Sequence, residues 1–210
     1  MTVSPLAVTG ALHFTAPVFP DDRGFFGTPL QAGLFAETTG RPLFPLAQAS
    51  YSRSRRGVVR GVHYTAAPPG AEKYVYCVHG ALLDIVVDIR VGSPTYGQWD
   101  AVRLTGDRMD ALYLPVGVGH AFVALTDDAV MQYLLSREYE PSDERAVSVL
   151  DPRLGLPVGN PAGHDLSERD RAAPTLEQAR EAGLLPDYAR CRAIEVRNLR
   201  DAPARAAGGR

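Results

Sequence analysis

Apolar residues in the middle of the chain occur in short runs that are separated by turn residues and lack helical spacing. Glycine, proline, aspartate or serine bounds each run, which is typical of short β-strands joined by tight turns. Because no helix separates these runs, the pattern favours an antiparallel sandwich or barrel over a parallel sheet with crossover helices. We predict strands within residues 3–19, 43–52, 57–90, 99–104, 111–115, 120–125 and 129–136.

Two of these regions allow a more detailed prediction. The runs 120–125 and 129–136 are predicted to form a strand pair joined at Asp127 and Asp128. In the last strand of 57–90, successive side chains point to opposite faces. One face is therefore apolar and the other is a wet or pocket face, which carries Asp84, Val86, Asp88 and Arg90.

The two ends of the chain differ from this pattern. Residues 30–39 are predicted to form one or two helical turns, which Gly40 and Pro42 stop. Near the other end, Thr175 to Gln178 has the pattern of a capping box, and the helix that it starts is predicted to end at Gly183. We expect residues 199–210 to be a disordered tail, because this Ala/Arg/Gly segment has nothing to bury.

Composition and charge exclude several classes of function. Hydrophobic residues make up 45% of the 210 residues and charged residues 22%, which is typical of a globular protein. The net charge of −2 provides no general attraction to nucleic acid or membrane, so an anionic ligand needs a local group of arginines. Cys77 and Cys191 have neither metal nor redox spacing, and the N-terminus lacks the pattern of a signal peptide. We expect a cytoplasmic protein.

Lys73 is the only lysine among the 22 lysine and arginine residues. An arginine-biased composition makes this exception informative, since an ammonium offers a compact charge with a pKa that its surroundings can shift. The residue is therefore a candidate for a site, although a chance surface lysine is the alternative.

Two histidines stand in patterns that resemble the signatures of the cupin barrels. Gly117 and His120 match part of the second signature, and Gly57 followed by His63 resembles the start of the first. In metal-binding cupins a second histidine and a glutamate complete the site, but Thr65 stands at the place of that histidine and no glutamate follows at the family spacing. Two imidazoles alone bind metal poorly, so we expect no metal. The histidines then line a pocket as base or hydrogen-bond donor, or are satisfied core residues.

A longer set of motifs resembles the dTDP-4-dehydrorhamnose 3,5-epimerase family. The resemblance implies a mainly β fold, a cupin-type jelly-roll antiparallel β-barrel with a few short, mostly C-terminal helices. It further implies a single domain over residues 1–198 and no cofactor. The motifs follow the family's order from about residue 5 to 188: Asp22–Phe26, Arg60–Tyr64, Lys73–Val75, Asp84–Arg90, Ser93–Gly97, Pro115–Phe122, Tyr133, Tyr139, Glu144, Asp151–Pro152 and Leu166–Asp170.

The resemblance also implies a reaction on dTDP-4-keto-6-deoxy sugars. In such a sugar C3 and C5 both flank the C4 ketone, so their protons are acidic enough for a positioned base. The family pattern assigns His63 as the base and Asp170 as the carboxylate that orients it. Lys73, with His120, would stabilise the oxyanion, and Tyr133 would return a proton from the opposite face.

For the nucleotide, the resemblance implies guanidinium contacts to the diphosphate and a ring stacked on thymine. Arg23 and Arg60 would bind the diphosphate, and Tyr139 would stack. Arg23 and Phe26 would reach the neighbouring subunit's site, which implies a homodimer that exchanges N-terminal strands. The implied substrate-binding residues are Arg23, Phe26, Thr28, Gln48, Arg60, His120, Tyr139, Glu144 and Arg169.

Arg60 and His63 present a geometric difficulty. On a regular strand they face opposite sides, because their positions differ by an odd number. Both can face one pocket only if the strand is irregular between them. We predict a bulge at Gly61.

Three departures from the family pattern narrow the expected function. Thr28 stands where the family has an acidic residue, Leu134 where a lysine follows the tyrosine, and Leu156 where a tryptophan precedes proline. These changes are more typical of the antibiotic deoxysugar relatives. Our hypothesis is a 5-epimerase, with or without action at C3, on a 4-keto-2,6-dideoxy or related sugar. The alternatives are a ketoisomerase of the same barrel and a non-catalytic sugar-binding cupin.

Overall fold

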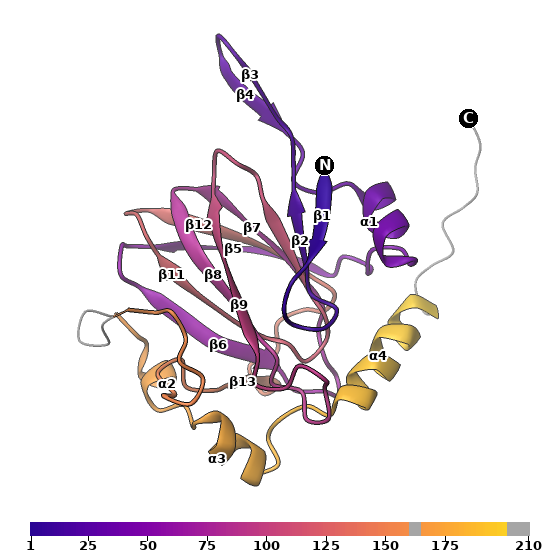
Figure 1. Ribbon diagram of the computed structural model, residues 1–210, viewed down its shortest axis with the longest axis vertical. Helices are drawn as coiled ribbons and strands as arrows, with labels where there is room; N and C mark the ends of the chain where they lie inside the picture. Colours follow the sequence, from indigo (N-terminus) through magenta and orange to yellow (C-terminus); the bar gives the residue numbers. More distant parts are fainter. Residues whose placement is uncertain (160–164, 201–210) are drawn as a thin grey trace.

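Two antiparallel sheets face each other and form the body of the molecule (Figure 1). The computed structural model describes residues 1–159 and 165–200. The first sheet contains, in spatial order, β1 (Thr2–Pro5), β2 (Leu12–Thr15), β10 (Ala111–Leu114), β7 (Lys73–His79), β12 (Ala129–Leu135) and β5 (Gln48–Ser54). The second contains β13 (Glu144–Ala146), β6 (Val59–Thr65), β11 (Gly119–Ala124), β8 (Ala81–Val87) and β9 (Trp99–Thr105). The predicted mainly β, antiparallel fold is confirmed.

The main core lies between the two sheets, where both contribute apolar side chains. Residues at alternate positions of each strand point inward, as the period of two requires. The buried members from the strands are Val75, Cys77, Leu82, Val86, Leu104, Leu112, Leu114, Phe122, Ala124, Ala129 and Met131. This packing fixes the spacing of the sheets and leaves their polar inward residues to line a cavity.

Helices and loops cover the outer faces of both sheets. Helix α1 (Ala32–Thr39) places Phe35 against the six-stranded sheet, and this helix confirms the prediction for residues 30–39. The C-terminal segment covers the five-stranded sheet and contains α2 (Glu168–Arg171) and α3 (Leu176–Glu181). The predicted capping box of Thr175 and Gln178 is present in α3, and Gly183 follows the helix with a positive φ.

The final helix was not expected from the sequence. Helix α4 (Tyr188–Arg200) packs Cys191 and Ile194 against Val116. Leu199 and Arg200 therefore belong to a helix, and the prediction of a disordered tail is wrong for these two residues. The remainder of the predicted tail, 201–210, lies outside the described residues.

The connection between β11 and β12 corrects a second prediction. These strands follow each other around Asp127 and Asp128, but β11 pairs with β6 and β8, whereas β12 pairs with β5 and β7. From β5 to β13 every connection except that between β8 and β9 crosses from one sheet to the other. A short turn indicates that the chain reverses, but the shared core decides which strands it then joins.

Two strand predictions need adjustment. β5 begins at Gln48 rather than at residue 43, and the preceding segment contains Pro42 and Pro45. In and beyond β8, Asp84 does line the interior, but the expected wet face is wrong further along, where Asp88 and Arg90 form a buried ion pair with an Oδ2···Nη2 distance of 2.8 Å. Both faces of β8 are buried because the C-terminal segment covers the outer one.

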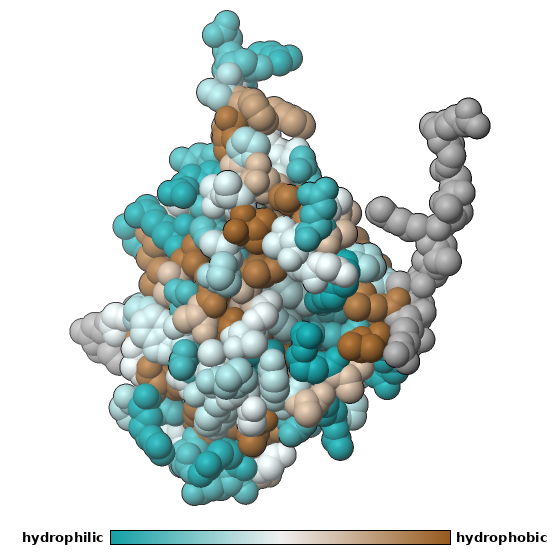
Figure 2. Space-filling model, turned by 45° about the vertical axis from the view of Figure 1, so that its right-hand side comes forward, coloured by the Kyte–Doolittle hydropathy of each residue, from teal (hydrophilic) through white to brown (hydrophobic). Residues whose placement is uncertain are grey.

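A two-stranded hairpin projects from the body (Figure 1). It consists of β3 (Val18–Asp21) and β4 (Gly24–Gly27). Figure 2 shows apolar surface on this projection below a hydrophilic tip. Phe19, Phe25 and Phe26 are 59%, 48% and 69% exposed. Three exposed aromatic rings on one small hairpin are unusual for a surface that faces only water.

An irregularity at Gly61 brings Arg60 and His63 to the same side of β6. The register between β6 and β11 shifts between the pairs His120–His63 and Phe122–Arg60. Gly61 has φ of 122°, in the region that favours glycine. The predicted irregularity is therefore confirmed.

Gly61→Ala is expected to lower the free energy of unfolding by about 3 kcal/mol, because a side chain is both strained and crowded here. An added Cβ would lie 2.5 Å from the carbonyl oxygen of His120. Urea denaturation at fixed protein concentration measures the change. Gly33→Ala in α1, where no atom lies within 4 Å of the added carbon, is the matched control and should change stability by less than about 1 kcal/mol. Equal effects of the two substitutions would contradict this account.

Candidate active site

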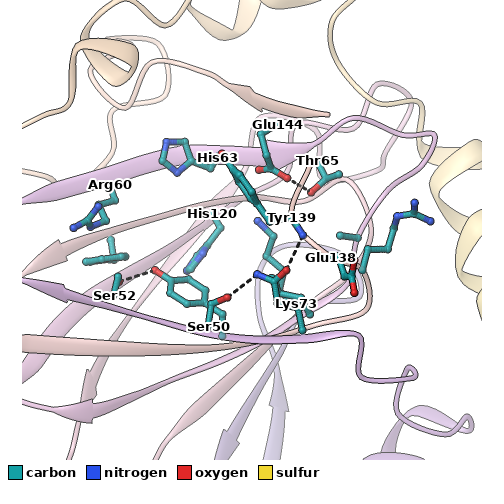
Figure 3. Close-up of a pocket in the computed structure, with 16 residues that line it drawn as sticks. Ser50, Ser52, Arg60, His63, Thr65, Lys73, His120, Glu138, Tyr139 and Glu144 are labelled. Atoms are coloured by element: carbon teal, nitrogen blue, oxygen red, sulfur yellow. Dashed lines mark hydrogen bonds between the residues drawn. The ribbon is translucent and has the colours of Figure 1, made fainter. Parts of the chain in front are cut away.

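A cavity of about 260 Å³ lies between the two sheets and gathers most of the predicted site residues (Figure 3). One wall comes from β5, β7 and β12, and the other from β6, β11 and β13. The predicted residues that line it are Gln48, Arg60, His63, Lys73, His120, Tyr133, Tyr139 and Glu144. All but Tyr139, which lies in the loop after β12, come together because they occupy positions on strands of the facing sheets.

His63 and Asp170 form a close pair, with 2.6 Å between Nε2 and Oδ1. Asp170 is held by α2, where the Ser167 side chain accepts a hydrogen bond from its backbone N–H. Burial opposes ionisation of Asp170, but hydrogen bonding to His63 and Ser167 nevertheless holds the pKa of its carboxyl below the ordinary value. The carboxylate can therefore orient the imidazole and stabilise it when protonated.

His120 has a second carboxylate partner that the sequence prediction did not assign. Its Nε2 lies 2.8 Å from Oδ2 of Asp84, and both side chains are buried. His120 is also the cross-strand neighbour of His63. The polar face of the strand pointed to Asp84, but nothing in the sequence paired it with His120.

Lys73 begins β7 and extends into the cavity (Figure 3). Burial lowers the pKa of Lys73, the nearby Arg169 lowers it further, and Glu144 opposes the shift. Within the described residues the ammonium makes no ion pair. It remains available for a charge that develops in the cavity.

Tyr133 lies on β12, in the wall opposite His63. Its phenol oxygen is 3.2 Å from Oγ of Ser52, and its ring lies edge-on to His120 with 6.2 Å between centroids. Burial raises the pKa of Tyr133 to about 12. The phenol is therefore protonated at neutral pH.

The remaining predicted residues line this cavity or the cavity beside it. Gln48 accepts a hydrogen bond from the backbone N–H of Tyr139 at 2.8 Å, and the Tyr139 side chain is 55% exposed. Glu144 accepts one from Thr65 at 2.7 Å. Arg169 lines an adjoining cavity of about 390 Å³ that shares Arg60 and His63 with the first.

Three predicted residues are remote from this chain's cavity lining. Arg23, Phe26 and Thr28 lie on or just after the projecting hairpin, and Arg23 pairs with Asp21 at 2.5 Å. They can serve a site only where the hairpin meets another surface.

Several lining residues were missed by the sequence analysis. They are Ser50, Ser52, Thr65, Ala71, Phe122, Leu135, Arg137 and Glu138. The two serines had a usable signal, because Gln48, Ser50, Ser52 and Ser54 alternate along one strand. The loop residues Arg137 and Glu138 had none.

Neither a metal-binding group nor a membrane-spanning helix is found in the described ranges. Over residues 1–159 and 165–200, no three His, Cys, Asp or Glu side chains gather as metal ligands would. The helices in the same ranges are too short or too polar to cross a membrane.

Comparisons with known proteins agree on one family. The family profile described as dTDP-4-dehydrorhamnose 3,5-epimerase matches residues 5–178. A dTDP-4-dehydrorhamnose 3-epimerase of Streptomyces niveus is 48% identical over 198 residues, which cover 93% of this chain and 94% of that protein. Among solved structures, a 4-keto-6-deoxy sugar epimerase from the novobiocin gene cluster of Streptomyces spheroides has a TM-score of 0.87 at 48% identity, covering 91% of this chain and 95% of that one.

A second solved structure shows a relative with a ligand. The 3'-monoepimerase ChmJ of Streptomyces bikiniensis, in complex with dTDP-quinovose, has a TM-score of 0.85 at 42% identity and covers 93% of this chain and 98% of its own. Both the profile match and these relatives span nearly the whole folded chain. The chain therefore belongs to the dTDP-4-dehydrorhamnose 3,5-epimerase family.

Proposed function

We propose that this protein epimerises a dTDP-4-keto-6-deoxyhexose at C3, C5 or both, in deoxysugar biosynthesis. One observation carries the proposal: His63 and Tyr133 line one cavity from opposite sheets. A sugar ring between the sheets presents one face to each residue. Removal of a proton from one face and its replacement from the other inverts the carbon.

The first step is abstraction of the proton next to the C4 ketone. His63 takes this proton, and the electron pair of the C–H bond moves to the carbonyl oxygen as an enolate. Asp170, 2.6 Å from the imidazole, stabilises the imidazolium that results. The same base can serve C3 and C5, since both carbons adjoin the ketone.

The enolate oxygen then needs positive charge or donated hydrogen bonds. Lys73 supplies an ammonium without an ion-pair partner in the described residues, and His120, held by Asp84, lies in the opposite wall. Preorganised donors of this kind contribute about 3 kcal/mol each to stabilisation of an oxyanion.

In the last step Tyr133 gives its phenolic proton to the carbon from the other face. The phenolate that remains takes a proton from solvent, and His63 loses its proton to solvent. These two transfers restore the enzyme, and the overall reaction consumes no cofactor.

For the nucleotide we propose contacts from both subunits of a homodimer. Arg60 would bind the diphosphate and Tyr139 would stack on thymine, with Gln48, Glu144 and Arg169 nearby. Arg23, Phe26 and Thr28 would come from the partner's hairpin, which fits the exposure of its three phenylalanines. Cys77 and Cys191 are free thiols, which fits the reducing cytoplasm that we propose as the protein's location.

The carbon that is inverted stays a prediction. The named relatives include 3-epimerases as well as 3,5-epimerases. Proton NMR of dTDP-4-keto-6-deoxyglucose with the protein in D₂O tests the function and assigns the carbon. Loss of the C3 signal, the C5 signal or both, with formation of an epimer, supports an epimerase. A new ketone position would indicate a ketoisomerase, and tight binding without any exchange would indicate a binding protein.

We expect activity to fall at alkaline pH because Lys73 loses its proton there. The ammonium is the active form, so kcat/KM falls as the pH rises through a pKa below the ordinary lysine value of 10.5. Tyr133, with a pKa of about 12, stays protonated over this range and cannot cause the loss. A pH–rate profile measures it.

Lys73→Met should lower kcat by about 10²-fold and abolish this alkaline loss. Lys73→Arg is the matched variant, because it keeps a positive charge that does not titrate in this range. An unchanged alkaline loss in Lys73→Met would assign the titration to another group.

Mixed dimers test the proposed contribution of the hairpin. A variant with both Arg23→Ala and Phe26→Ala, and a second variant with His63→Ala, should each have little activity as homodimers. Co-expression should recover about a quarter of wild-type activity, because one site in each mixed dimer combines an intact cavity with an intact hairpin. Failure of the mixture to exceed the two homodimers would contradict hairpin exchange.

A further inference from the structure

The inner face of β5 is a row of four polar side chains, three of which bind a different part of the site. Gln48 binds the backbone of Tyr139, Ser52 binds Tyr133, and Ser54 accepts a hydrogen bond from Nε of Arg60 at 3.1 Å. The residues between them point outward and are exposed. An edge strand thus makes hydrogen bonds to three other segments of the cavity, to side chains in two of them and to the backbone in the third.

Ser52 is the only hydrogen-bond partner of the Tyr133 phenol among the described residues. In the β5–β12 register Tyr133 lies opposite Ser50, so its ring reaches diagonally along the strand to Ser52. Ser50 bonds instead to Gln48, with 2.7 Å between Oγ and Nε2. The register therefore gives the two serines different partners: Ser52 contacts the Tyr133 phenol, and Ser50 contacts Gln48.

The position of a phenol matters for the proposed reaction. Rotation about the side-chain torsions moves the oxygen of a tyrosine over several ångströms, and a misplacement of about 1 Å costs on the order of 100-fold in rate. From the other wall of the cavity, the His120 ring lies at 74° to the ring of Tyr133, and His120 makes no hydrogen bond to the phenol oxygen in the described residues. Among the described residues, the Ser52 hydroxyl is the only group that holds the phenol oxygen by a hydrogen bond.

We propose that Ser52 is the positioning residue for Tyr133, and that it determines how often the enolate is protonated with inversion. The proposal rests on the proposed function, because it concerns the same enolate. That intermediate has two fates. Tyr133 can protonate it on the far face, which gives the epimer, or His63 can return a proton to the near face, which restores the substrate.

These two fates are measured separately in D₂O. Return from His63 after exchange with solvent leaves deuterium in unchanged substrate, and protonation by Tyr133 leaves deuterium in the epimer. The ratio of exchange without inversion to inversion therefore reports the position of the acid. A general disturbance of the cavity slows both processes and leaves the ratio unchanged.

Ser52→Ala is expected to raise this ratio about tenfold, the effect of losing one well-placed hydrogen bond. Ser52→Thr keeps the hydroxyl and suits a strand, so it should restore the wild-type ratio. In a Tyr133→Phe background, Ser52→Ala should change nothing further, because the phenol is already absent. Ser54→Ala, which affects Arg60 instead, should raise KM without changing the ratio.

An unchanged ratio in Ser52→Ala, with wild-type exchange intact, would overturn the proposal and leave the epimerase function standing. An equal decrease of both rates would overturn it as well and assign Ser52 a structural role. Absence of both exchange and inversion in the wild-type protein would instead contradict the proposed function. The proposed role of Ser52 would then be contradicted as well, because it concerns the same enolate.

Discussion

His63→Ala is expected to lower epimerisation by at least about 10³-fold and to abolish deuterium exchange at both C3 and C5. His63 is the base in the proposed reaction, in which His120, held by Asp84, is assigned to the enolate oxygen rather than to a C–H proton. Loss of exchange as well as of product follows, since no enolate forms. Quantitative proton NMR with the wild type and the variant at matched concentrations measures both.

Two further variants make this result specific. Asp170→Asn keeps the shape of the partner but removes its charge, and should reduce kcat strongly with little effect on nucleotide binding. His79→Ala changes an exposed histidine at the end of β7, outside the cavity lining, and should retain wild-type exchange. Substantial exchange in His63→Ala would require a different base.

Tyr133→Phe is expected to give a different pattern. Inversion should fall by about 10²-fold or more, because the acid on the far face is lost, while exchange without inversion continues through His63. The same NMR experiment resolves the two, since one places deuterium in the epimer and the other in the substrate. Tyr51→Phe, on the outer face of β5 where the ring is 74% exposed, is the matched control.

The outcome distinguishes the roles of the two residues. If Tyr133→Phe abolished exchange together with inversion, Tyr133 would be needed to form the enolate, and the assignment of base and acid would have to change. Persistent exchange assigns it to the second proton transfer alone.

Local features of the fold followed from the sequence because they depend on neighbouring residues. Turn residues marked the strand ends, Gly61 marked the irregularity, and Thr175 with Gln178 marked a helix start. Pairing between distant strands has no such local signal. The turn after β11 therefore suggested a strand pair, whereas the core required a crossing to the other sheet.

Helix α4 is a second element that local sequence patterns did not predict. Its buried residues are Cys191, Ile194 and Glu195, and the rest of the segment is largely polar and rich in arginine. In the sequence, a segment with so few apolar positions looks like a solvent-exposed segment rather than a packed helix. Tertiary contacts make the helix part of the fold, including packing on Val116 and the hydrogen bond that Glu195 accepts from the backbone N–H of Val116.

The candidate site was foreseen largely through family resemblance. His63 and Asp170 are 107 positions apart in the sequence, and no spacing rule connects them. The structure brings together eight predicted residues in one cavity and leaves Arg23, Phe26 and Thr28 on a separate hairpin. The pairing of Asp84 with His120 and the contact of Ser52 with Tyr133 were not predicted, because each residue acts through another side chain and such a role depends on register.

A single-turnover reaction in D₂O tests the central claim most directly. Enzyme in excess over dTDP-4-keto-6-deoxyglucose is quenched after one turnover, and the epimer is examined by mass spectrometry and NMR. With His63 and Tyr133 on opposite faces, the inverted carbon takes its hydrogen from the solvent-equilibrated phenol, so we predict one deuterium at each inverted carbon. An epimer that retained the original protium would show that a single group removes and returns the proton, and would contradict the two-residue mechanism.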